Sequence, residues 1–402
     1  MITFNRDYIN NALKTLNFQS FTQIQEEIIP EALKGRDCIG VSETGSGKTH
    51  AFLLPIFDAL THGESKGVQA LIIAPTRELA AQIESMAKAI GEHAPNRIDI
   101  RSYYGGSDRT REIERLKKTQ PDIAIGTPGK LADLAIKENV LKIHTAKHVV
   151  IDEADMALEQ GFIDTLHTLT SKVGHNAQLM VFTATLPKHL QRFVEKSMRN
   201  PKQVILDTLR LKNLDIRHRF MRTTDEGRMQ TLLKLLPTFN PYLGLIFTNT
   251  KDDAQMLKGV LHREGYSVTA LHGDLSQRER KQAMRAIDTL NVQYIVASDM
   301  ASRGMDIKGV SHIINYDFPP KMHFYIHRSG RTGRMGMSGE VITLYNKRDH
   351  EAFEYLQKEE VRFEFIDVKK GEIIVKDSDK DVMKQAQKRY EYQKHHQKNK
   401  RK

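Results

Sequence analysis

"VVIDEADMAL" spans residues 149–158 and joins a short apolar run to three carboxylates. The first three residues are β-branched, and such a run is typical of a strand buried on both faces of a parallel sheet. Acidic side chains do not favour a core, so we expect Asp152, Glu153 and Asp155 to lie where this strand ends. They mark either a solvated turn or a site that holds a metal and a water for chemistry.

Similar apolar runs, each ending in small, polar or acidic residues, recur along the chain. One series lies at 70–75, 122–128, 148–155 and 178–185, and a second at 244–250, 267–273, 294–299, 312–319 and 340–346, with helical patterns between them. This alternation predicts an α/β fold with parallel sheets flanked by helices. Ligands of open α/β sheets bind beyond the carboxyl ends of the strands, so the polar strand ends are the first place to look for a site.

The chain length predicts two domains, because 402 residues exceed the size at which single cores usually stop growing. A polar, weakly periodic stretch separates the two series of strands. The predicted boundaries are therefore 1–206 for the first domain, 207–216 for a linker and 217–366 for the second domain. After about residue 366 the pattern decays into a charged stretch, which predicts a frayed or helical basic extension over 367–402.

The composition is that of a soluble globular protein with a basic end. The net charge is +11, and residues 384–402 carry eight Lys or Arg and one Glu, a net of +7. Such an end either holds a polyanion near the core or serves only solubility. The single cysteine, Cys38, suits a reducing compartment, so we expect a cytoplasmic protein. We see no secretory signal and no apolar stretch that would span a bilayer, so no membrane is expected as a partner.

"SETGSGKT" (residues 42–49) departs from the phosphate-loop pattern G-x-x-x-x-G-K-[ST] only at its first position, Ser42. Glycines at 45 and 47 permit turns that direct backbone N–H groups inward at a helix N-terminus, which makes an anion nest. Lys48 would reach the β- and γ-phosphates of a nucleotide, and Thr49 would bind Mg²⁺. The alternative is a plain Gly/Ser turn before a helix, but a strand-like run precedes the loop and a helical pattern follows it.

The acidic end of the opening stretch fits as the partner of this loop. Asp152 would hold Mg²⁺ through its waters, because this ion dehydrates reluctantly. Glu153 would orient or deprotonate the attacking water. Alone, D-E-A-D is as consistent with an acidic turn that begins a helix. Its place about a hundred residues after the phosphate loop favours the functional interpretation.

With "TGSGKT" and "DEAD" in this order, the chain resembles the DEAD-box ATP-dependent RNA helicases of superfamily 2, and among them a small bacterial-type member. Further motifs of that family lie within roughly residues 1–350. They are "PTRELA" (75–80), "GG" (105–106), "TPGK" (127–130), "TAT" (183–185), "LIFTNT" (245–250), "QRER" (277–280), "SDMASRGMD" (298–306) and "HRSGRTGR" (327–334). The resemblance implies two tandem RecA-like domains, ATP and Mg²⁺ as cofactors, and RNA as a partner.

The resemblance also implies which residues contact ATP. They are Phe4, Thr22, Gln25, Thr44, Gly45, Ser46, Gly47, Lys48, Thr49, Asp306, Arg331 and Arg334. Gln25 would pair with adenine N6 and N7, as amides do on adenine in DNA. Phe4 would stack on the base, although it lies nearer to the motif "NFQSFTQIQ" (17–25) than is usual in this family. Asp306 would bind the ribose, and Arg331 and Arg334 would act as arginine fingers.

Two further sets of roles follow from the resemblance. The implied RNA contacts are Pro75, Thr76, Arg77, Gly105, Gly106, Thr127, Pro128, Gly129, Thr250, Gly273, Arg280 and Ser298. The implied links between ATP and RNA are Asp155, Thr183, Thr185 and Arg303, with His327 joining Arg303 in bridging the domains. Lys130 stands where Arg is usual, which keeps the charge but loses the planar fork.

Together these residues predict an RNA-dependent ATPase that locally unwinds short RNA duplexes or remodels RNA–protein complexes. Contacts to phosphates and 2′-hydroxyls would make RNA binding largely independent of sequence. A DNA helicase and an ATP-gated RNA clamp with little unwinding are the alternatives. By resemblance we expect a monomer that acts in ribosome assembly or on RNA structure in the cold, with ribosomal precursors or RNA-degradation proteins as partners.

Overall fold

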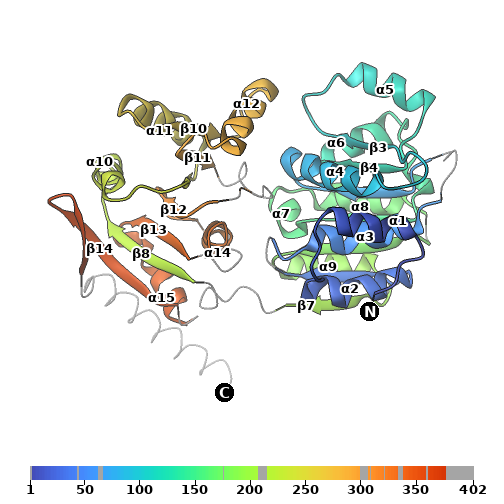
Figure 1. Cartoon of the computed structure of the whole chain (residues 1–402), viewed down its shortest axis with the longest axis horizontal. Coiled ribbons are helices and arrows are strands. Elements are labelled where there is room, and N and C mark those ends of the chain that lie inside the picture. Colours follow the sequence, from blue (N-terminus) through green and yellow to red (C-terminus); the bar gives the residue numbers. More distant parts are fainter. Residues whose placement is uncertain are drawn as a thin grey trace. The chain divides into compact units, whose positions relative to one another are not determined.

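The computed structural model describes residues 2–42, 45–61, 67–174, 176–206, 215–298, 307, 309–320, 322–333, 338–358 and 361–376. The chain divides into two compact units, residues 1–208 and 209–402 (Figure 1). Each unit has its own sheet and its own hydrophobic cores.

The first unit is built on a seven-stranded sheet in the order β3-β4-β2-β5-β6-β1-β7. Its strands are β1 (Cys38–Val41), β2 (Ala70–Ile73), β3 (Ile100–Tyr103), β4 (Ile123–Gly126), β5 (His148–Ile151), β6 (Gln178–Thr183) and β7 (Lys202–Ile205). The strand pairs described in this sheet are all parallel. The strands therefore end at one common edge, and the polar residues that follow them gather there.

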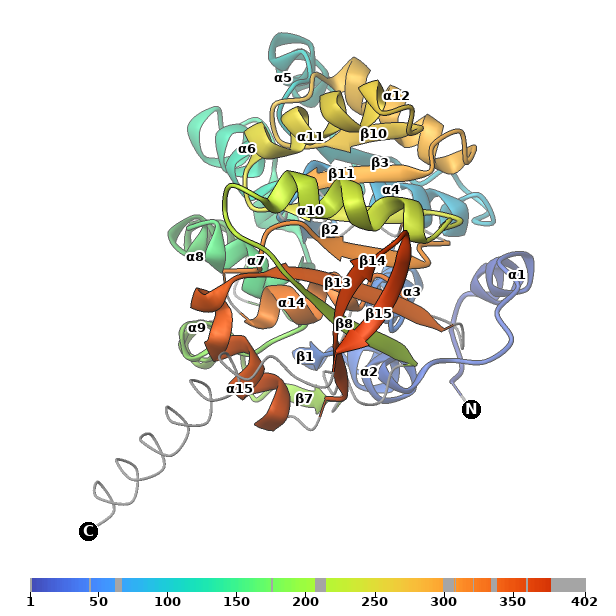
Figure 2. The same ribbon diagram turned by 90° about the vertical axis from the view of Figure 1, so that its left-hand side faces the viewer.

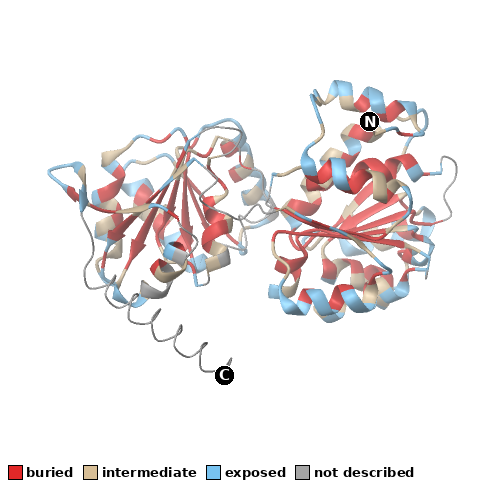
Figure 3. Ribbon diagram, turned by 90° about the horizontal axis from the view of Figure 1, so that it is seen from below, coloured by how far each residue is buried: buried red, intermediate tan, exposed pale blue. Residues whose placement is uncertain are grey.

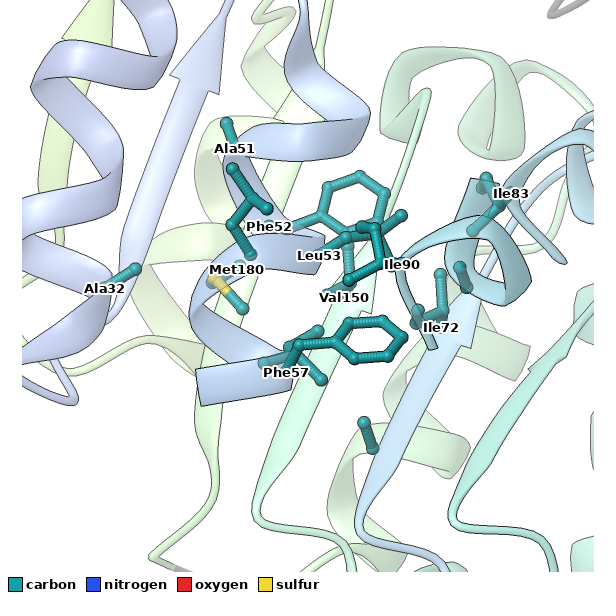
Figure 4. Packing of buried hydrophobic residues seen from close by; sticks show 14 of the residues in the cluster. Ala32, Ala51, Phe52, Leu53, Phe57, Ile72, Ile83, Ile90, Val150 and Met180 are labelled. Atoms are coloured by element: carbon teal, nitrogen blue, oxygen red, sulfur yellow. The ribbon is translucent and has the colours of Figure 1, made fainter. Parts of the chain in front are cut away.

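Helices cover both faces of this sheet. They are α1 (Asp7–Thr15), α2 (Gln23–Leu33), α3 (Lys48–Ala59), α4 (Arg77–Gly91), α5 (Arg109–Lys118), α6 (Pro128–Ala132), α7 (Ala154–Glu159), α8 (Ile163–Lys172) and α9 (Lys188–Ser197), with a π-helical turn η1 (Asp133–Lys137) and a 3₁₀ turn η2 (Ile143–Thr145). Val150 packs in the core formed with α1 to α4, and Figure 4 shows it there near Phe52 and Met180. Val149 and Ile151 pack in the other core, with α6 to α9. The opening run is thus buried on both faces, as its sequence predicts.

The second unit is built on an eight-stranded sheet in the order β10-β11-β9-β12-β13-β8-β14-β15. Its strands are β8 (Ile216–Arg222), β9 (Gly244–Thr248), β10 (Val268–Leu271), β11 (Tyr294–Ser298), β12 (His312–Asn315), β13 (Gly339–Tyr345), β14 (Phe363–Lys369) and β15 (Glu372–Lys376). The described pairs are parallel except that of β14 with β15. Two mostly parallel sheets flanked by helices confirm the predicted fold class.

The second sheet also packs between two cores. Its described helices are α10 (Arg228–Leu235), η4 (Leu236–Thr238), α11 (Lys251–Arg263), α12 (Gln277–Asp288), α14 (Met322–Ser329), η5 (Lys347–Asp349) and α15 (His350–Lys358). One core joins the sheet to α12, α14 and α15, and the other joins it to α10 and α11. In both units the central strands are buried while the helices expose their outer faces (Figure 3). None of the described helices is long and apolar enough to span a membrane.

The hairpin of β14 and β15 corrects the predicted extension over 367–402. Residues 367–376 are not frayed or helical, because β14 pairs with β8 and β15 pairs with β14 at the edge of the sheet (Figure 2). Lys370 and Gly371 both have positive φ angles, of 52° and 81°, which suit a two-residue hairpin turn. Ile366 and Val368 are buried. The predicted linker also extends one residue too far, since Ile216 already begins β8; residues 207–214 and 377–402 lie outside the described residues.

The hairpin leads to a prediction about truncated chains. Removing residues 377–402 should leave the unfolding temperature of the second unit unchanged, whereas removing 367–402 should lower it. The longer deletion exposes the neighbours of Val368, and burial of one such side chain contributes about 1.5–3 kcal/mol. Scanning calorimetry of the two truncated chains measures the difference, and equal unfolding temperatures would contradict a structural role for the hairpin.

Candidate active site

The phosphate loop connects β1 to α3 at the carboxyl edge of the first sheet. Gly45 and Gly47 have φ angles of 89° and 97°, a left-handed conformation that glycine adopts without strain. The hydroxyls of Ser42 and Ser46 lie 2.7 Å apart across the loop. Lys48 and Thr49 begin α3. The predicted contact Thr44 lies outside the described residues.

The predicted adenine-binding residues lie directly against this loop. Gln25 Nε2 donates to the Gly47 carbonyl at 3.0 Å, and Gln25 Oε1 accepts from the Thr22 backbone N–H at 3.0 Å. A Cβ atom at Gly47 would come within 2.4 Å of Gln25 Nε2, so any other residue here would displace this amide. The amide nitrogen keeps a second hydrogen and the amide oxygen a second lone pair. Gln25 therefore retains one donor and one acceptor for a base.

Phe4 is buried, and its burial disfavours the predicted stacking. It is 6% exposed in the core of the first unit, and its ring packs edge-on against Phe21 with centroids 6.4 Å apart. The sequence reasoning overlooked Phe18, a half-buried aromatic that contacts the ring of His50 at 4.9 Å, next to Thr49. Base stacking by Phe4 stays a prediction.

Three acids at the end of β5 are all buried: Asp152, Glu153 and Asp155 are 2%, 6% and 5% exposed. Lys48 Nζ lies 3.3 Å from Glu153 Oε1 and donates to the Ser42 carbonyl at 2.8 Å. Burial, followed by the charge of Glu153, raises the pKa of Asp152 to about 7 against the opposing charge of Lys48. The charges of Glu153 and Asp155 both raise this pKa, so a cation bound beside Asp152 would relieve their repulsion.

The backbone of Glu153 is left-handed, with φ 46° and ψ 52°, and this residue precedes the first turn of α7. A non-glycine residue in this region stores of order 1–3 kcal/mol of strain, and such residues cluster at functional sites. Here the sharp turn accompanies a Glu153 side chain that is directed at Lys48 rather than at solvent.

Asp155 connects the acid cluster to the end of β6. Its Oδ2 atom accepts from the Thr185 backbone N–H at 3.0 Å and from the Thr185 hydroxyl at 2.7 Å. Its backbone N–H donates to the Thr183 hydroxyl at 3.2 Å, and that hydroxyl donates to the Thr185 carbonyl at 2.7 Å. The structure therefore brings together three of the four predicted coupling residues.

The predicted RNA contacts of the first unit follow three neighbouring strands, β3, β4 and β2. They are Gly105 and Gly106 after β3, Thr127, Pro128 and Gly129 after β4, and Pro75, Thr76 and Arg77 after β2. A Cβ atom at Gly105 would lie 2.8 Å from Arg77 Nη2, so the guanidinium occupies space that only glycine leaves open. Thr76 caps α4 by accepting from the Leu79 backbone N–H. Lys130 pairs with Glu112 of α5 at 2.6 Å.

The second unit repeats this arrangement at the ends of β9, β10 and β11. Thr250 follows β9 and caps α11, Gly273 follows β10, and Ser298 ends β11. Arg280 on α12 donates to the His272 carbonyl at 2.7 Å. His327 lies in α14 and Arg331 follows that helix. The predicted site residues Arg303, Asp306 and Arg334 lie outside the described residues.

Known proteins share this fold and these motifs. Residues 22–193 match the family model described as DEAD/DEAH box helicase, and residues 227–336 match the helicase conserved C-terminal domain. The DEAD-box ATP-dependent RNA helicase CshB of Listeria monocytogenes is 41% identical over 367 residues, 91% of this chain and 84% of that protein. CshB of Bacillus subtilis is 41% identical over 369 residues, which cover 91% and 83% of the two chains.

Among solved structures, S. cerevisiae Dbp5 bound to RNA and ADP BeF3 aligns with a TM-score of 0.80 and 28% identity over 90% of this chain and 93% of that one. The chain belongs to the DEAD-box ATP-dependent RNA helicases. This confirms the family that its motifs predict, and with it the enzyme class of an RNA-dependent ATPase with two RecA-like domains.

The raised pKa of Asp152 predicts how stability depends on pH. Between about pH 4, where the unfolded carboxyl titrates, and pH 7, the folded state binds the extra proton, so the stability of the wild type falls as the pH rises. Asp152→Asn removes this effect. At pH 8, without nucleotide or divalent metal, the variant should be more stable than the wild type by up to about 4 kcal/mol, and at pH 4 the gain should vanish.

Scanning calorimetry of the first unit's transition at several pH values measures this gain. Asp164→Asn, which changes an exposed carboxyl at the start of α8, is the matched control. A gain of equal size at pH 4 and pH 8 would contradict the protonated, buried Asp152.

Proposed function

We propose that the chain couples ATP hydrolysis to the local separation of short RNA duplexes. The observation that carries the proposal is the buried assembly in which Lys48 contacts Glu153 while Asp155 contacts Thr185. Lys48 is suited to hold phosphates and Glu153 to activate water. Glu153 lies two residues before Asp155, whose hydrogen bonds lead to Thr185 after the neighbouring strand β6. Such a link is what a hydrolysis-driven change in RNA binding requires.

In the first step, ATP would replace the contacts within the phosphate loop. Lys48 would leave Glu153 for the β- and γ-phosphates, and the backbone N–H groups of Gly45, Ser46 and Gly47 would surround the phosphate oxygens. Glu153, freed from its ion pair, would then orient the attacking water. Gln25 would select adenine with its remaining donor and acceptor.

The residues present also fit a magnesium ion. The described residues hold no group of three His, Cys, Asp or Glu side chains arranged for a metal. A magnesium ion at this site would be bound together with ATP. Thr49 would bind it through its hydroxyl and Asp152 through water. When bound, the ion neutralises charge on the phosphates. The repulsion among the buried carboxylates, which raises the pKa of Asp152, is the feature that supports its binding.

RNA would contact both units at the carboxyl edges of their sheets. Backbone amides, glycines and threonines dominate the candidate contacts, and groups of this kind suit phosphates and 2′-hydroxyls rather than base edges. Arg331 and Arg334 would add positive charge at the γ-phosphate to that of Lys48, a contribution of roughly 10³–10⁵ in rate in enzymes with arginine fingers. Hydrolysis would then require ATP and RNA together.

The wider setting rests on the relatives. CshB proteins are named as RNA helicases, and Dbp5 was solved with RNA, which supports RNA as the partner of this chain. We propose a monomer in the cytoplasm that acts on ribosomal precursors or beside RNA-degradation proteins, including RNA structure in the cold. The basic stretch 384–402 would hold RNA near the core by charge.

The choice of nucleic acid tests the proposal directly. Single-stranded and duplex RNA should raise ATP turnover strongly, and DNA of the same sequence should not. A radiolabelled duplex measured in parallel shows whether strands separate. Equal stimulation by DNA would favour the DNA helicase, and turnover without strand release would favour the ATP-gated clamp.

Glu153→Gln tests the assigned water-orienting role. The amide preserves the side-chain shape but cannot accept a proton, so RNA-stimulated turnover should fall by about 10²–10⁴-fold, while RNA binding in the presence of ATP should persist or tighten. Lys48→Ala, by contrast, should lose both turnover and ATP-dependent RNA binding. Filter binding with and without ATP, alongside phosphate release, separates these two outcomes, and ordinary turnover in Glu153→Gln would refute the role.

A further inference from the structure

The outer side of β3 is an open edge of the first sheet. β3 is the terminal strand in the sheet order, and no strand of the described residues pairs with its outer side. On the inner side, the carbonyls of Asp99 and Tyr103 accept backbone hydrogen bonds of 2.8–3.2 Å from β4 and the residues that flank it. Alternate residues of a strand bond to opposite sides, so Ile100 and Ser102 direct their backbone N–H and C=O groups outward.

A cavity of about 510 Å³ borders this open edge. It is lined by residues 97–102, by the second half of α4 and the turn after it, and by Arg115 of α5. Sites that bury a ligand typically have volumes of about 300–1,000 Å³. The open edge is therefore bordered by space for the side chains of a further strand, which would pair over about the four residues of β3.

Two of the three acids that line the cavity are already neutralised within the chain. Arg101 Nε donates to Asp99 Oδ1 at 2.9 Å, and Lys88 donates to Glu84 Oε1 at 2.7 Å. The Ser102 hydroxyl also donates to Glu84. These pairs leave no charge of their own for a ligand to balance.

Two arginines at the cavity are not neutralised in this way. Arg97 lies in the turn before β3 and Arg115 lies on α5, and both are exposed. Within the described part of the chain, neither side chain forms a hydrogen bond or an ion pair, and Glu92 is the one lining acid that also forms none. A net positive charge therefore remains, and a guanidinium binds a carboxylate through two parallel hydrogen bonds.

We propose that the open edge of β3 binds an extended, acidic segment of a partner protein, which adds to the first sheet as a further strand. The backbone of that segment would pair with Ile100 and Ser102, and its carboxylates would pair with Arg97 and Arg115. A peptide uses both the N–H donors and the C=O acceptors of the edge, whereas a phosphate chain would use the arginines and leave the C=O groups unpaired. This inference does not rest on the proposed function.

The open edge lies apart from the predicted RNA contacts of the first unit. Gly105 follows β3 at its carboxyl end, five residues or up to about 16 Å of extended chain beyond Ile100. Arg77 begins α4, whereas Lys88, which lines the cavity, lies eleven residues or about 16 Å further along that helix. The partner segment and RNA should therefore bind at the same time.

Fluorescence anisotropy with a defined peptide tests the proposal on the full chain. The probe is a fluorescein-labelled octapeptide of alternating Glu and Val, which supplies carboxylates and favours an extended strand. One control peptide replaces each Glu with Lys, and a second is N-methylated at every residue, which removes its backbone donors. The first peptide should bind saturably, and both controls should bind at least tenfold more weakly.

Ser102→Pro tests the strand pairing. Proline removes an outward N–H and keeps the bonds of β3 to β4, because an edge strand tolerates proline where the N–H faces outward. The Kd of the Glu/Val peptide should rise at least tenfold. Ser102→Ala is the matched control: it removes the hydroxyl bond to Glu84 but keeps the N–H, so the Kd should stay within about twofold.

A double charge reversal, Arg97→Glu with Arg115→Glu, tests the charge pairing and keeps the proposal testable if the proline variant does not fold. It should weaken binding of the Glu/Val peptide and tighten binding of the Lys/Val peptide. Lys117→Glu changes an exposed residue of α5 that does not line the cavity, so it should alter neither Kd by more than about twofold. Calorimetry checks that each variant is folded.

The inference is overturned if the Glu/Val peptide does not bind the wild type saturably, if the control peptides bind as tightly, or if the folded variants bind like the wild type. Displacement of the peptide by single-stranded RNA would overturn it too and assign this surface to RNA. Without peptide, RNA-stimulated ATP turnover should stay within about twofold in every variant, and a larger loss would contradict a separate docking site. Wild-type turnover that RNA does not raise would instead overturn the proposed function, so the two failures are distinct.

Discussion

The ion pair of Lys48 and Glu153 is the interaction on which the active site depends. Both groups are buried, and a buried charge is tolerated only when it is paired and hydrogen-bonded. The lysine meets these conditions with Glu153 and with the Ser42 carbonyl, which fixes the phosphate loop against the end of β5. The groups proposed to bind phosphate and to orient water therefore stabilise each other in this structure.

Polar contacts extend from this pair in both directions along the sheet edge. On one side, Gln25 connects α2 to the phosphate loop by a hydrogen bond to the Gly47 carbonyl. The segment that would bind the base and the loop that would bind the phosphates are therefore in direct contact. On the other side, Asp155 ties the acid cluster to Thr185 after β6. The parallel sheet makes this possible, since its strands end at one edge and deliver distant motifs to it.

The sequence predicted most strands because their apolar runs are uninterrupted. Because the motifs are ordered along the chain, it also predicted the family and the pairing of the phosphate loop with the acidic end of β5. It missed β8, "IRHRFMR", because charged residues hide the pattern. In the structure Arg219 is paired with Glu340 and Glu364, contacts that join residues more than a hundred positions apart. The hairpin after residue 366 was missed for a related reason, since its partner β8 is distant in sequence. The burial of Phe4 and of Arg328 likewise arises from long-range packing.

The left-handed backbone of Glu153 places chemistry and stability in opposition at one residue. Glycine would relax that backbone at no steric cost, and asparagine or aspartate would adopt it more readily than glutamate. A protein with a more relaxed backbone, but without the glutamate proposed to orient water, is therefore a single substitution away. Selection for thermal stability alone, in the laboratory or in nature, would favour the loss of Glu153, and under its proposed role only selection on turnover would maintain the strained residue.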